Sequence, residues 1–386
     1  MREKLLASVQ ENESDMFKLL ETLVLLPSSS RFKRGVDAVG TLVVRSLGSS
    51  GMDLEISHQS EFGNHLLFRS PACRNGRSGL LLFGHMDTIF PADSPFNWYK
   101  DEGEKVFGPG VIDMKGGLVC AIYAIKALAS LGLLEKIPIT FFCNSDEEIG
   151  SPTSSTLITT EAKKSLLALG FECGGLHGEV VTGRKGRLGY KLTITGKAGH
   201  AAFAGTDKAS AILELAHKII ALEELNDPDR KIIVNVGTVL GGIGPNTVAD
   251  HAAAEIDTRF LSVADAADTA ERITRMVSQC KVSGTLAELI KTGERLPMEQ
   301  TPGNSGLFKI IAGEAKLLGI PCREELRSGV SDANTIAQTG IPVVDGMGPI
   351  GDCDHSDQEY MIRTSLPDRV KLAACSILKS WEHFCL

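Results

Sequence analysis

The stretch Phe141–Gly150, which reads F-F-C-N-S-D-E-E-I-G, joins the end of a predicted core strand to three consecutive acids. Residues 138–143 are apolar and rich in β-prone side chains, which predicts a buried strand of the parallel kind. Asp146, Glu147 and Glu148 follow, and three adjacent carboxylates repel one another unless water or a cation surrounds them. Ligands bind at the carboxyl ends of strands in open α/β sheets. The stretch therefore predicts either a solvated acidic loop or a cation site.

The composition argues against several classes of function. The chain has 386 residues, enough for two domains or for one domain with an insertion. Hydrophobic residues make up 43% and charged residues 23% of the sequence, as in soluble globular proteins. The net charge of −8 gives no support to nucleic acid or an anionic membrane surface as a partner. No apolar stretch is long enough for a transmembrane helix.

The cysteine pattern bears on the location of the protein. Nine cysteines are scattered along the chain, and no two of them form a C-x-x-C pair. An odd number in a chain of this length predicts reduced thiols in a cytoplasmic protein rather than a disulfide framework. Residues 1–15 are charged and lack the apolar segment of a secretory signal, so we expect none.

The segments around the acidic stretch predict an α/β domain made of residues 1–182 and 296–386. Residues 1–26 have the apolar period of one amphipathic helix, which Pro27 ends. Further along the chain, buried strands and helices alternate, as in a mixed, largely parallel sheet covered by helices. We expect these further elements near residues 80–83, 118–130, 166–171, 307–318, 341–345 and 366–384.

Residues 183–295 have a different character. Residues 187–195 alternate between apolar and polar side chains, as in a half-buried antiparallel strand. The block continues in the order helix, strand, strand, helix, strand, which is the ferredoxin-like arrangement. We therefore expect an inserted α+β domain between the two parts of the α/β domain.

Side chains of the metal-ligand type follow five strand ends or loops of the α/β domain. Each of them alone is a weak signal, but their joint occurrence at strand ends is hard to attribute to chance. Imidazole and carboxylate without thiolate suit zinc, with cobalt or manganese as alternatives. The residues are His85, Asp87, Asp113, Glu147, Glu148, Glu172 and His355.

This set fits two zinc ions. A pair of ions about 3.5–4 Å apart needs a bridging carboxylate to offset their repulsion, and we assign Asp113 to that place. His85 and His355 would supply one nitrogen to each ion. Glu148 and Glu172 would complete the two sites.

Two acids of the set remain without a metal. Asp87 lies two residues after His85 in an extended segment, so the two side chains project the same way and Asp87 can orient the imidazole. Glu147 is the candidate general base that takes a proton from the attacking water and gives it to the leaving amine.

Several segments resemble the dinuclear zinc M20 metallopeptidases, in the right order and over almost the whole chain. This family includes carboxypeptidase G2-like enzymes, aminoacylases, acetylornithine deacetylases and succinyl-diaminopimelate desuccinylases. The resemblance implies a zinc-peptidase-like catalytic domain and a cis peptide bond between Asp113 and Met114. The segments are His85–Thr88 (H-M-D-T), Gly110–Gly117 (G-V-I-D-M-K-G-G), Asp146–Gly150 (D-E-E-I-G), Phe171–Glu172 (F-E) and Gly351–Ser356 (G-D-C-D-H-S).

The inserted domain resembles the lid and dimerisation domain of the same family. Segment 196–201, G-K-A-G-H-A, is similar to the lid motif whose histidine reaches the partner subunit's active site, which implies that His200 stabilises an oxyanion there. Asn246 and Arg259 match the family's substrate-binding asparagine and arginine, and the arginine is the type of side chain that binds a carboxylate bidentately. The resemblance thus implies a homodimer.

The function that follows is hydrolysis of a peptide or N-acyl amide, with release of an amino acid that has a free carboxylate. Segments 293–299 and 348–351 look closer to the carboxypeptidase branch of the family. An N-acyl amino acid deacylase of the acetylornithine or desuccinylase type is the alternative, because family membership does not fix the acyl group. A catalytically silent ligand-binding homologue is the alternative from another class.

Overall fold

A computed structural model describes residues 1–76 and 79–385, and the chain divides into two compact units. The first unit contains residues 1–183, 300–326 and 331–386. The second contains residues 184–299 and also residues 327–330, which the three-segment division expected from the sequence does not include. No helix in the described part of the chain is long and apolar enough to cross a membrane. None of the cysteines whose side chains are described is in a disulfide bond.

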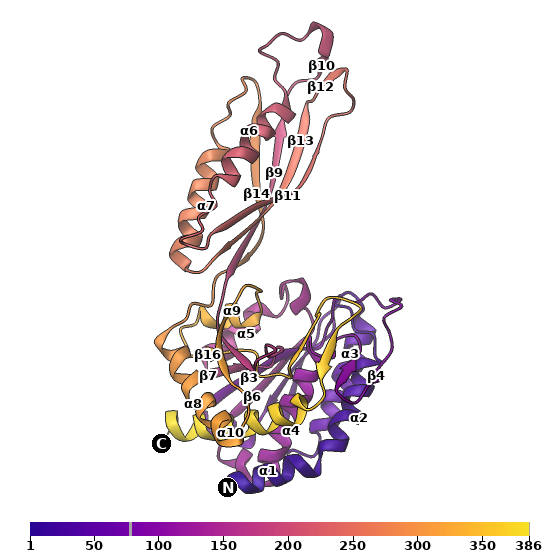
Figure 1. The fold of residues 1–386 in the computed structure, drawn as a ribbon, viewed down its shortest axis with the longest axis vertical. Coiled ribbons are helices and arrows are strands. Elements are labelled where there is room, and N and C mark those ends of the chain that lie inside the picture. Colours follow the sequence, from indigo (N-terminus) through magenta and orange to yellow (C-terminus); the bar gives the residue numbers. More distant parts are fainter. Residues whose placement is uncertain (77–78, 386) are drawn as a thin grey trace. The chain divides into compact units, whose positions relative to one another are not determined.

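The first unit is built on a mixed, largely parallel sheet of six strands (Figure 1). The second strand in the order is antiparallel to both of its neighbours, and the last four strands run parallel to one another. The strand order is β1 (Asp53–Ser57), β2 (His65–Arg69), β6 (Ile139–Asn144), β3 (Gly79–His85), β7 (Ser165–Gly170) and β16 (Val343–Val344).

Helices cover both faces of this sheet, which explains the continuous apolar runs of its central strands. In β3, Leu80 and Leu82 belong to the large core that also contains the buried side chains of α4 (Lys115–Ser130) and α10 (Ser365–Cys385). Leu81 and Phe83, which alternate with them along β3, are equally buried but point to the opposite face of the sheet. That face carries α5 (Ser155–Lys163) and α9 (Asp332–Ala337), which contact each other.

The N-terminal segment forms two helices instead of the single one predicted for residues 1–26. Helix α1 (Arg2–Glu11) ends and α2 (Glu13–Val24) begins at Asn12. The Asn12 side-chain amide donates a hydrogen bond to the backbone oxygen of Ser8, 2.8 Å away. Such local bonds compete with the helical ladder, which is why asparagine favours helix ends.

The remaining elements of the first unit are helices at its surface and short strands near the candidate site. Arg184 and Arg327, which end the two strands of the pair given last below, belong to the second unit. The helices are α3 (Lys33–Leu47) and α8 (Pro302–Leu318). One four-stranded sheet contains β4 (Lys100–Asp101), β5 (Lys105–Phe107), β17 (Gly351–Asp352) and β18 (Tyr360–Ile362), and one pair contains β8 (Glu179–Arg184) and β15 (Arg323–Arg327).

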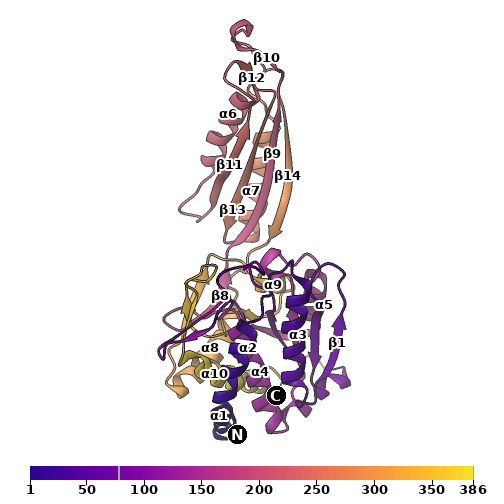
Figure 2. The ribbon, with the colours of Figure 1, turned by 90° about the vertical axis from the view of Figure 1, so that its right-hand side faces the viewer.

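The second unit has one four-stranded antiparallel sheet with two helices on one face (Figures 1 and 2). The sheet order is β11-β13-β9-β14, in which the second and fourth strands along the chain are at the edges. This is the ferredoxin-like arrangement predicted from the sequence. The elements are β9 (Gly186–Thr195), β10 (Gly199–His200), α6 (Ala211–Glu223), β11 (Ile233–Gly241), β12 (Thr247–Val248), β13 (His251–Phe260), α7 (Val263–Val277) and β14 (Leu286–Arg295).

One glycine fixes how closely α4 approaches the sheet. An ideal Cβ built on Gly117 would lie only 1.8 Å from the backbone oxygen of Phe171, the residue after β7 and before Glu172. Any side chain at this position would therefore push the start of α4 away from the strand end that carries Glu172.

We predict that Gly117→Ala destabilises the protein by about 1–3 kcal/mol, because the backbone of Phe171 must move to make room. Gly313→Ala is the matched control, since Gly313 lies in α8 and a Cβ there would meet nothing within 4 Å. The control should be neutral or stabilise by about 0.5–1 kcal/mol. Thermal unfolding of both variants checks this, and equal midpoints would contradict it.

Candidate metal-binding active site

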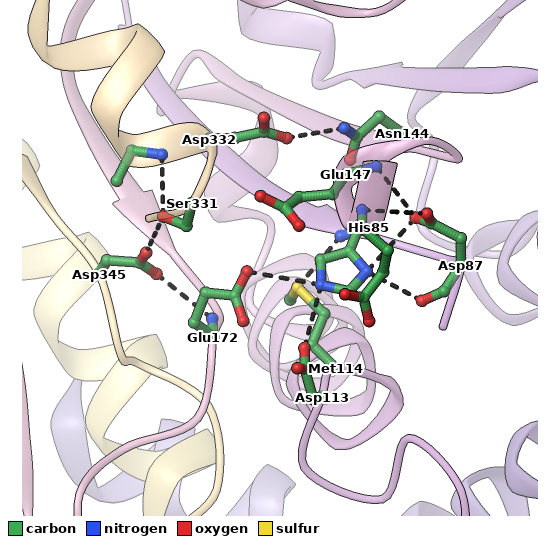
Figure 3. Close-up of polar contacts among 12 residues, drawn as sticks. His85, Asp87, Asp113, Met114, Asn144, Glu147, Glu172, Ser331, Asp332 and Asp345 are labelled. Carbon is green, nitrogen blue, oxygen red and sulfur yellow. Dashed lines mark hydrogen bonds and ion pairs between the residues drawn. The ribbon is translucent and has the colours of Figure 1, made fainter. Parts of the chain in front are cut away.

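The polar side chains predicted at strand ends meet at one edge of the six-stranded sheet. Strands β3 and β6 are parallel neighbours in which His85 pairs with Asn144, so both strands end at the same level. Strand β7 runs parallel on the other side of β3, with Phe83 opposite Gly170. Glu172 follows β7, as Glu147 follows β6. Figure 3 shows Asp113, Glu147 and Glu172 around the His85 imidazole.

Asp113 lies between the two histidines. It precedes α4, and its peptide bond to Met114 is cis, as the family resemblance implies. One carboxylate oxygen of Asp113, Oδ1, is 3.2 Å from His85 Nε2, and the other, Oδ2, is 3.1 Å from His355 Nε2. A single carboxylate thus contacts both imidazoles through different oxygens, which is the geometry required of a bridging ligand.

The other two predicted carboxylate ligands divide between the histidines. Glu172 Oε1 is 3.5 Å from His85 Nε2, and Glu148 Oε2 is 3.3 Å from His355 Nε2. The structure therefore brings the five predicted ligands together as two groups that share Asp113. Each group offers one imidazole and two carboxylates.

The loop that carries His355 adds one acid that the sequence did not single out. Ligand atoms of Asp113, Asp354 and His355 all lie within 4.8 Å of one another, so Asp354 can join the ligands on that side. His355 itself has a positive φ of 60°, which is uncommon in residues other than glycine. Such backbone conformations occur preferentially at functional sites.

The residues fit a divalent cation by their own chemistry. Glu148 Oε1 is buried and has no hydrogen-bond partner among the described atoms. A buried carboxylate oxygen without a partner costs about 1–3 kcal/mol or more, and a cation would remove that cost. His85, Asp113 and Glu148 have ligand atoms within 4.8 Å of one another, and nitrogen and oxygen ligands of this kind suit zinc, cobalt or manganese.

Electrostatics favours proton uptake by the same groups. Burial alone would lower the pKa of His85, but the charge of Glu172 and the contact with Asp113 raise it well above its usual value. Hydrogen bonds to Asp113 and Glu148 raise the pKa of His355 to about 11. Burial and the charge of Asp113 raise the pKa of Glu148 to about 7. Protons and cations therefore compete for these side chains, and cation binding must release protons.

The three consecutive acids have three different surroundings. Asp146 is fully buried and accepts hydrogen bonds from Thr153 and Ser154, so its role is structural. Glu148 is the acid that joins the possible ligands. Glu147 begins the short 3-10 helix Glu147–Ile149, and in Figure 3 its side chain points toward the side of His85 on which Glu172 lies.

Asp87 connects His85 to the acidic stretch. The Asp87 carboxylate accepts hydrogen bonds from the backbone N–H groups of Glu147 at 3.3 Å and Glu148 at 3.2 Å. His85 Nδ1 is 2.9 Å from the backbone oxygen of Asp87 and 3.4 Å from its carboxylate. The closer partner of the imidazole is therefore the backbone oxygen, whereas the sequence predicted the carboxylate. Asp87 can orient both the imidazole and the loop.

Two further buried aspartates, not identified from the sequence, hold the strand ends in place. Asp345 accepts hydrogen bonds from the backbone N–H of Glu172 at 3.3 Å and from the hydroxyl of Ser331 at 2.7 Å. Asp332 accepts one from the side chain of Asn144, the last residue of β6, at 2.7 Å. Figure 3 shows both around the site.

Glu359 fixes the turn that carries Asp113, and sequence reasoning missed it. Its carboxylate is fully buried and accepts backbone hydrogen bonds from Gly110 at 2.9 Å, Ile112 at 2.9 Å and Asp113 at 3.1 Å. Burial raises the pKa of Glu359 to about 8, although the bond from Ile112 opposes this shift. Because Glu359 follows His355 by four residues, it connects the loops of two predicted ligands.

The second unit brings two of its three predicted site residues together. His200 in β10 is paired with Thr247 in β12, and the backbone N–H of Ala201 donates to the backbone oxygen of Asn246 at 2.9 Å. The His200 side chain also accepts a bond from the Ala202 backbone N–H at 3.2 Å. His200 and Asn246 therefore form one exposed loop cluster.

Arg259 lies at the opposite end of the sheet from this cluster. It is eight residues along β13 from His251, which pairs with the last residue of β9 beside the cluster, and eight strand residues span about 26 Å. Arg259 Nε is 2.7 Å from Asp257 Oδ1. One copy of the second unit thus cannot place Arg259 and Asn246 on the same carboxylate.

We predict that Glu359→Ala lowers the affinity for zinc by about 10- to 100-fold, because the turn that positions Asp113 loses its acceptor. Glu359→Gln keeps one acceptor oxygen and should lose less. Glu135→Ala, at an exposed position, is the control. Competition with a chelator measures the affinities, and equal values for Glu359→Ala and Glu135→Ala would contradict the assignment.

Comparison with known proteins finds relatives that match most of the chain. The chain is 28% identical over 383 residues to carboxypeptidase G2 of Pseudomonas sp. (strain RS-16), covering 97% of this chain and 91% of that protein. It is 27% identical over 347 residues to a succinyl-diaminopimelate desuccinylase of Ectopseudomonas mendocina (strain ymp), covering 84% and 88% of the two chains.

Solved structures share the fold. An M20 family metallo-carboxypeptidase from Sulfolobus solfataricus superposes with a TM-score of 0.74 at 18% identity, covering 94% of this chain and 98% of that one. Aminopeptidase PepT from Bacillus cereus ATCC 10987 gives 0.78 at 21% identity, covering 95% and 98%. Residues 81–379 match the model of peptidase family M20/M25/M40, and the chain is a hydrolase that belongs to this family.

Proposed function

We propose that the protein is a dinuclear zinc hydrolase that cleaves a peptide or N-acyl amide bond and releases an amino acid with a free carboxylate. The observation that carries the proposal is the position of Asp113, with one oxygen beside each of two histidines. Glu172 and Glu148 each complete one of the two ligand groups. Cobalt or manganese could replace zinc in a site of this composition.

The residues around the ligands have separate tasks in this reaction. When bound, divalent ions would polarise the scissile carbonyl and lower the pKa of water. Glu147 takes the proton of the attacking water and donates it to the leaving amine. Of the three consecutive acids, Asp146 has a structural role and Glu148 is a ligand, so Glu147 is the one available for proton transfer. Asp87 holds the backbone of Glu147 in place by accepting a hydrogen bond from its N–H group.

Substrate recognition falls to the second unit. Arg259 binds the carboxylate of the released amino acid, for which a guanidinium offers two parallel donors. His200 and Asn246 act on the active site of a partner copy, where His200 stabilises the oxyanion. The distance of about 26 Å along β13 supports this division between two copies.

The surface of the second unit supports a homodimer. Strand β11 is at the edge of its sheet, and exposed edge strands readily pair with another chain. Val239 and Leu240 of this strand are 54% and 73% exposed, and Ile243 beyond it is 85% exposed. Apolar side chains gathered on one edge favour association with another copy.

Two alternatives remain. A deacylase of the acetylornithine or desuccinylase type has the same ligands, and the desuccinylase relative covers most of the chain. A silent ligand-binding homologue would show neither bound metal nor turnover after zinc or cobalt is added. A screen of dipeptides and N-acyl amino acids separates the alternatives. The cytoplasmic location stays a prediction.

We predict that Glu147→Ala retains zinc but loses turnover by a factor of about 100 or more, because the proton shuttle is gone while all five ligands remain. Metal content is measured beside kcat, with Glu135→Ala as the control. A Glu147→Ala protein with full activity would contradict the mechanism, and a protein that loses its zinc would make Glu147 a ligand.

We predict that two inactive variants restore activity together. In a hybrid dimer of Glu147→Ala and His200→Ala chains, one active site has an intact Glu147 and receives His200 from the partner. Random mixing of co-expressed chains in a two-fold dimer should recover roughly a quarter of wild-type activity. If His200 acts within its own chain, the mixture should stay as inactive as each variant.

A further inference from the structure

The sulfur atom of Met114 contacts the backbone of a predicted metal ligand. The backbone N–H of His85 donates a hydrogen bond to Met114 Sδ, 3.1 Å away, and Figure 3 shows this sulfur beside His85. Both residues are buried, Met114 completely. A thioether sulfur is only a weak acceptor, and backbone N–H groups of a sheet normally donate to carbonyl oxygens. The contact is therefore an unusual way to end a strand.

Strand β7 ends just before the level at which it would supply an acceptor to His85. The pairing of β3 with β7 ends at Phe83 and Gly170, and the N–H of Phe171 donates to the backbone oxygen of Phe83 at 3.1 Å. Alternate residues of a strand direct their backbone groups to the same side, so the His85 N–H points to the side of β7 as well. Met114 Sδ takes the place of the next acceptor there.

Two glycines leave room for the Met114 side chain at this place. An ideal Cβ built on Gly84 of β3 would lie 2.3 Å from Met114 Cε and 3.1 Å from Met114 Sδ. A Cβ on Gly117 of α4 would lie 2.9 Å from Met114 Cε. The thioether thus lies between the strand that ends in His85 and the helix that follows Asp113. A side chain at either glycine would displace the end of Met114.

The ordinary explanation is that Met114 only fills space in the core. Methionine adapts to irregular gaps and is often used for that purpose. Leucine would fill such a gap about as well, because exchanges between leucine and methionine nearly conserve volume. Leucine has no acceptor, however, and a buried N–H group left without one is costly. The hydrogen bond to sulfur is therefore what distinguishes methionine at this position.

We propose that the Met114 thioether is a positioning group of the metal site, because it fixes the backbone of His85 relative to Asp113. Met114 directly follows Asp113, whose Oδ1 is 3.2 Å from His85 Nε2. The bond from the His85 N–H to Met114 Sδ is a second connection between the same two segments. It holds the imidazole and the bridging carboxylate at one separation, as a preorganised site requires. This inference rests on the proposed function, since it takes His85 and Asp113 as ligands of one ion.

The test compares zinc binding by the full-length wild type and by Met114→Leu in competition with a chelator. Met114→Leu should bind the ion on the His85 side about 10- to 100-fold more weakly, and the ion on the His355 side as tightly as wild type does. Glu172→Ala removes a ligand on the His85 side and thus identifies the binding step of that ion. Equal affinities of wild type and Met114→Leu would overturn the proposal, and so would an equal loss in both steps.

Met16→Leu is the matched control. Met16 is also fully buried in the core that contains Met114, but it lies in α2, outside the contacts described for the ligands. The exchange should leave both zinc affinities unchanged. If it weakens binding on the His85 side as much as Met114→Leu does, lost packing explains both variants and the proposal is overturned.

Hydrogen exchange at the His85 amide tests the bond without a variant that must fold. With isotope-labelled histidines in the full-length protein, the His85 N–H of wild type should exchange slowly, and Met114→Leu should accelerate this exchange by about 10- to 100-fold. Fast exchange in wild type would overturn the proposal.

Failure of the proposed function would look different from failure of this inference. A wild-type protein that binds no zinc would overturn the proposed function, and with it the role of Met114 in metal binding, even if the His85 N–H exchanged slowly. A wild-type protein that binds zinc but whose affinities do not change in Met114→Leu would overturn the role of Met114 alone.

Discussion

The contact of one carboxylate with two imidazoles organises the candidate site. Asp113 reaches His85 with one oxygen and His355 with the other, although the three residues come from a strand end, a turn before a helix and a distant loop. Glu148 and Glu172 crowd further negative charge against these groups. Buried like charges are costly unless a cation or protons balance them, and the raised pKa values of the histidines express that demand.

The fold meets this demand through supports that are not ligands. Parallel strands bring their carboxyl ends to one edge, and buried acids hold the loops that follow. Asp87 accepts hydrogen bonds from backbone N–H groups of the acidic stretch, and Asp345 accepts one from the backbone N–H of Glu172. Glu359 accepts hydrogen bonds from backbone N–H groups of the turn before α4. Partners of this kind orient ligands and often matter for metal affinity nearly as much as the ligands themselves.

The sequence predicted what depends on local pattern and order. The apolar runs that end in His85 and in the three acids predicted strands with polar ends, and the alternation after Gly183 predicted the ferredoxin-like unit. It could not predict Glu359, because an acid in a loop is usually solvated and the partners of this one are backbone N–H groups 246–249 residues away. The sequence also did not predict the break between α1 and α2 at Asn12, because the apolar period continues across this residue. The hydrogen bond from the Asn12 side chain to the backbone ends the first helix there.

The central claim is that Asp113 bridges two ions. Crystals of the zinc-loaded protein, measured on both sides of the zinc absorption edge, test it most directly. The account predicts two anomalous peaks about 3.5–4 Å apart, each in contact with one oxygen of Asp113 and with one of the two histidines. A single peak, or two peaks of which only one touches Asp113, would contradict it.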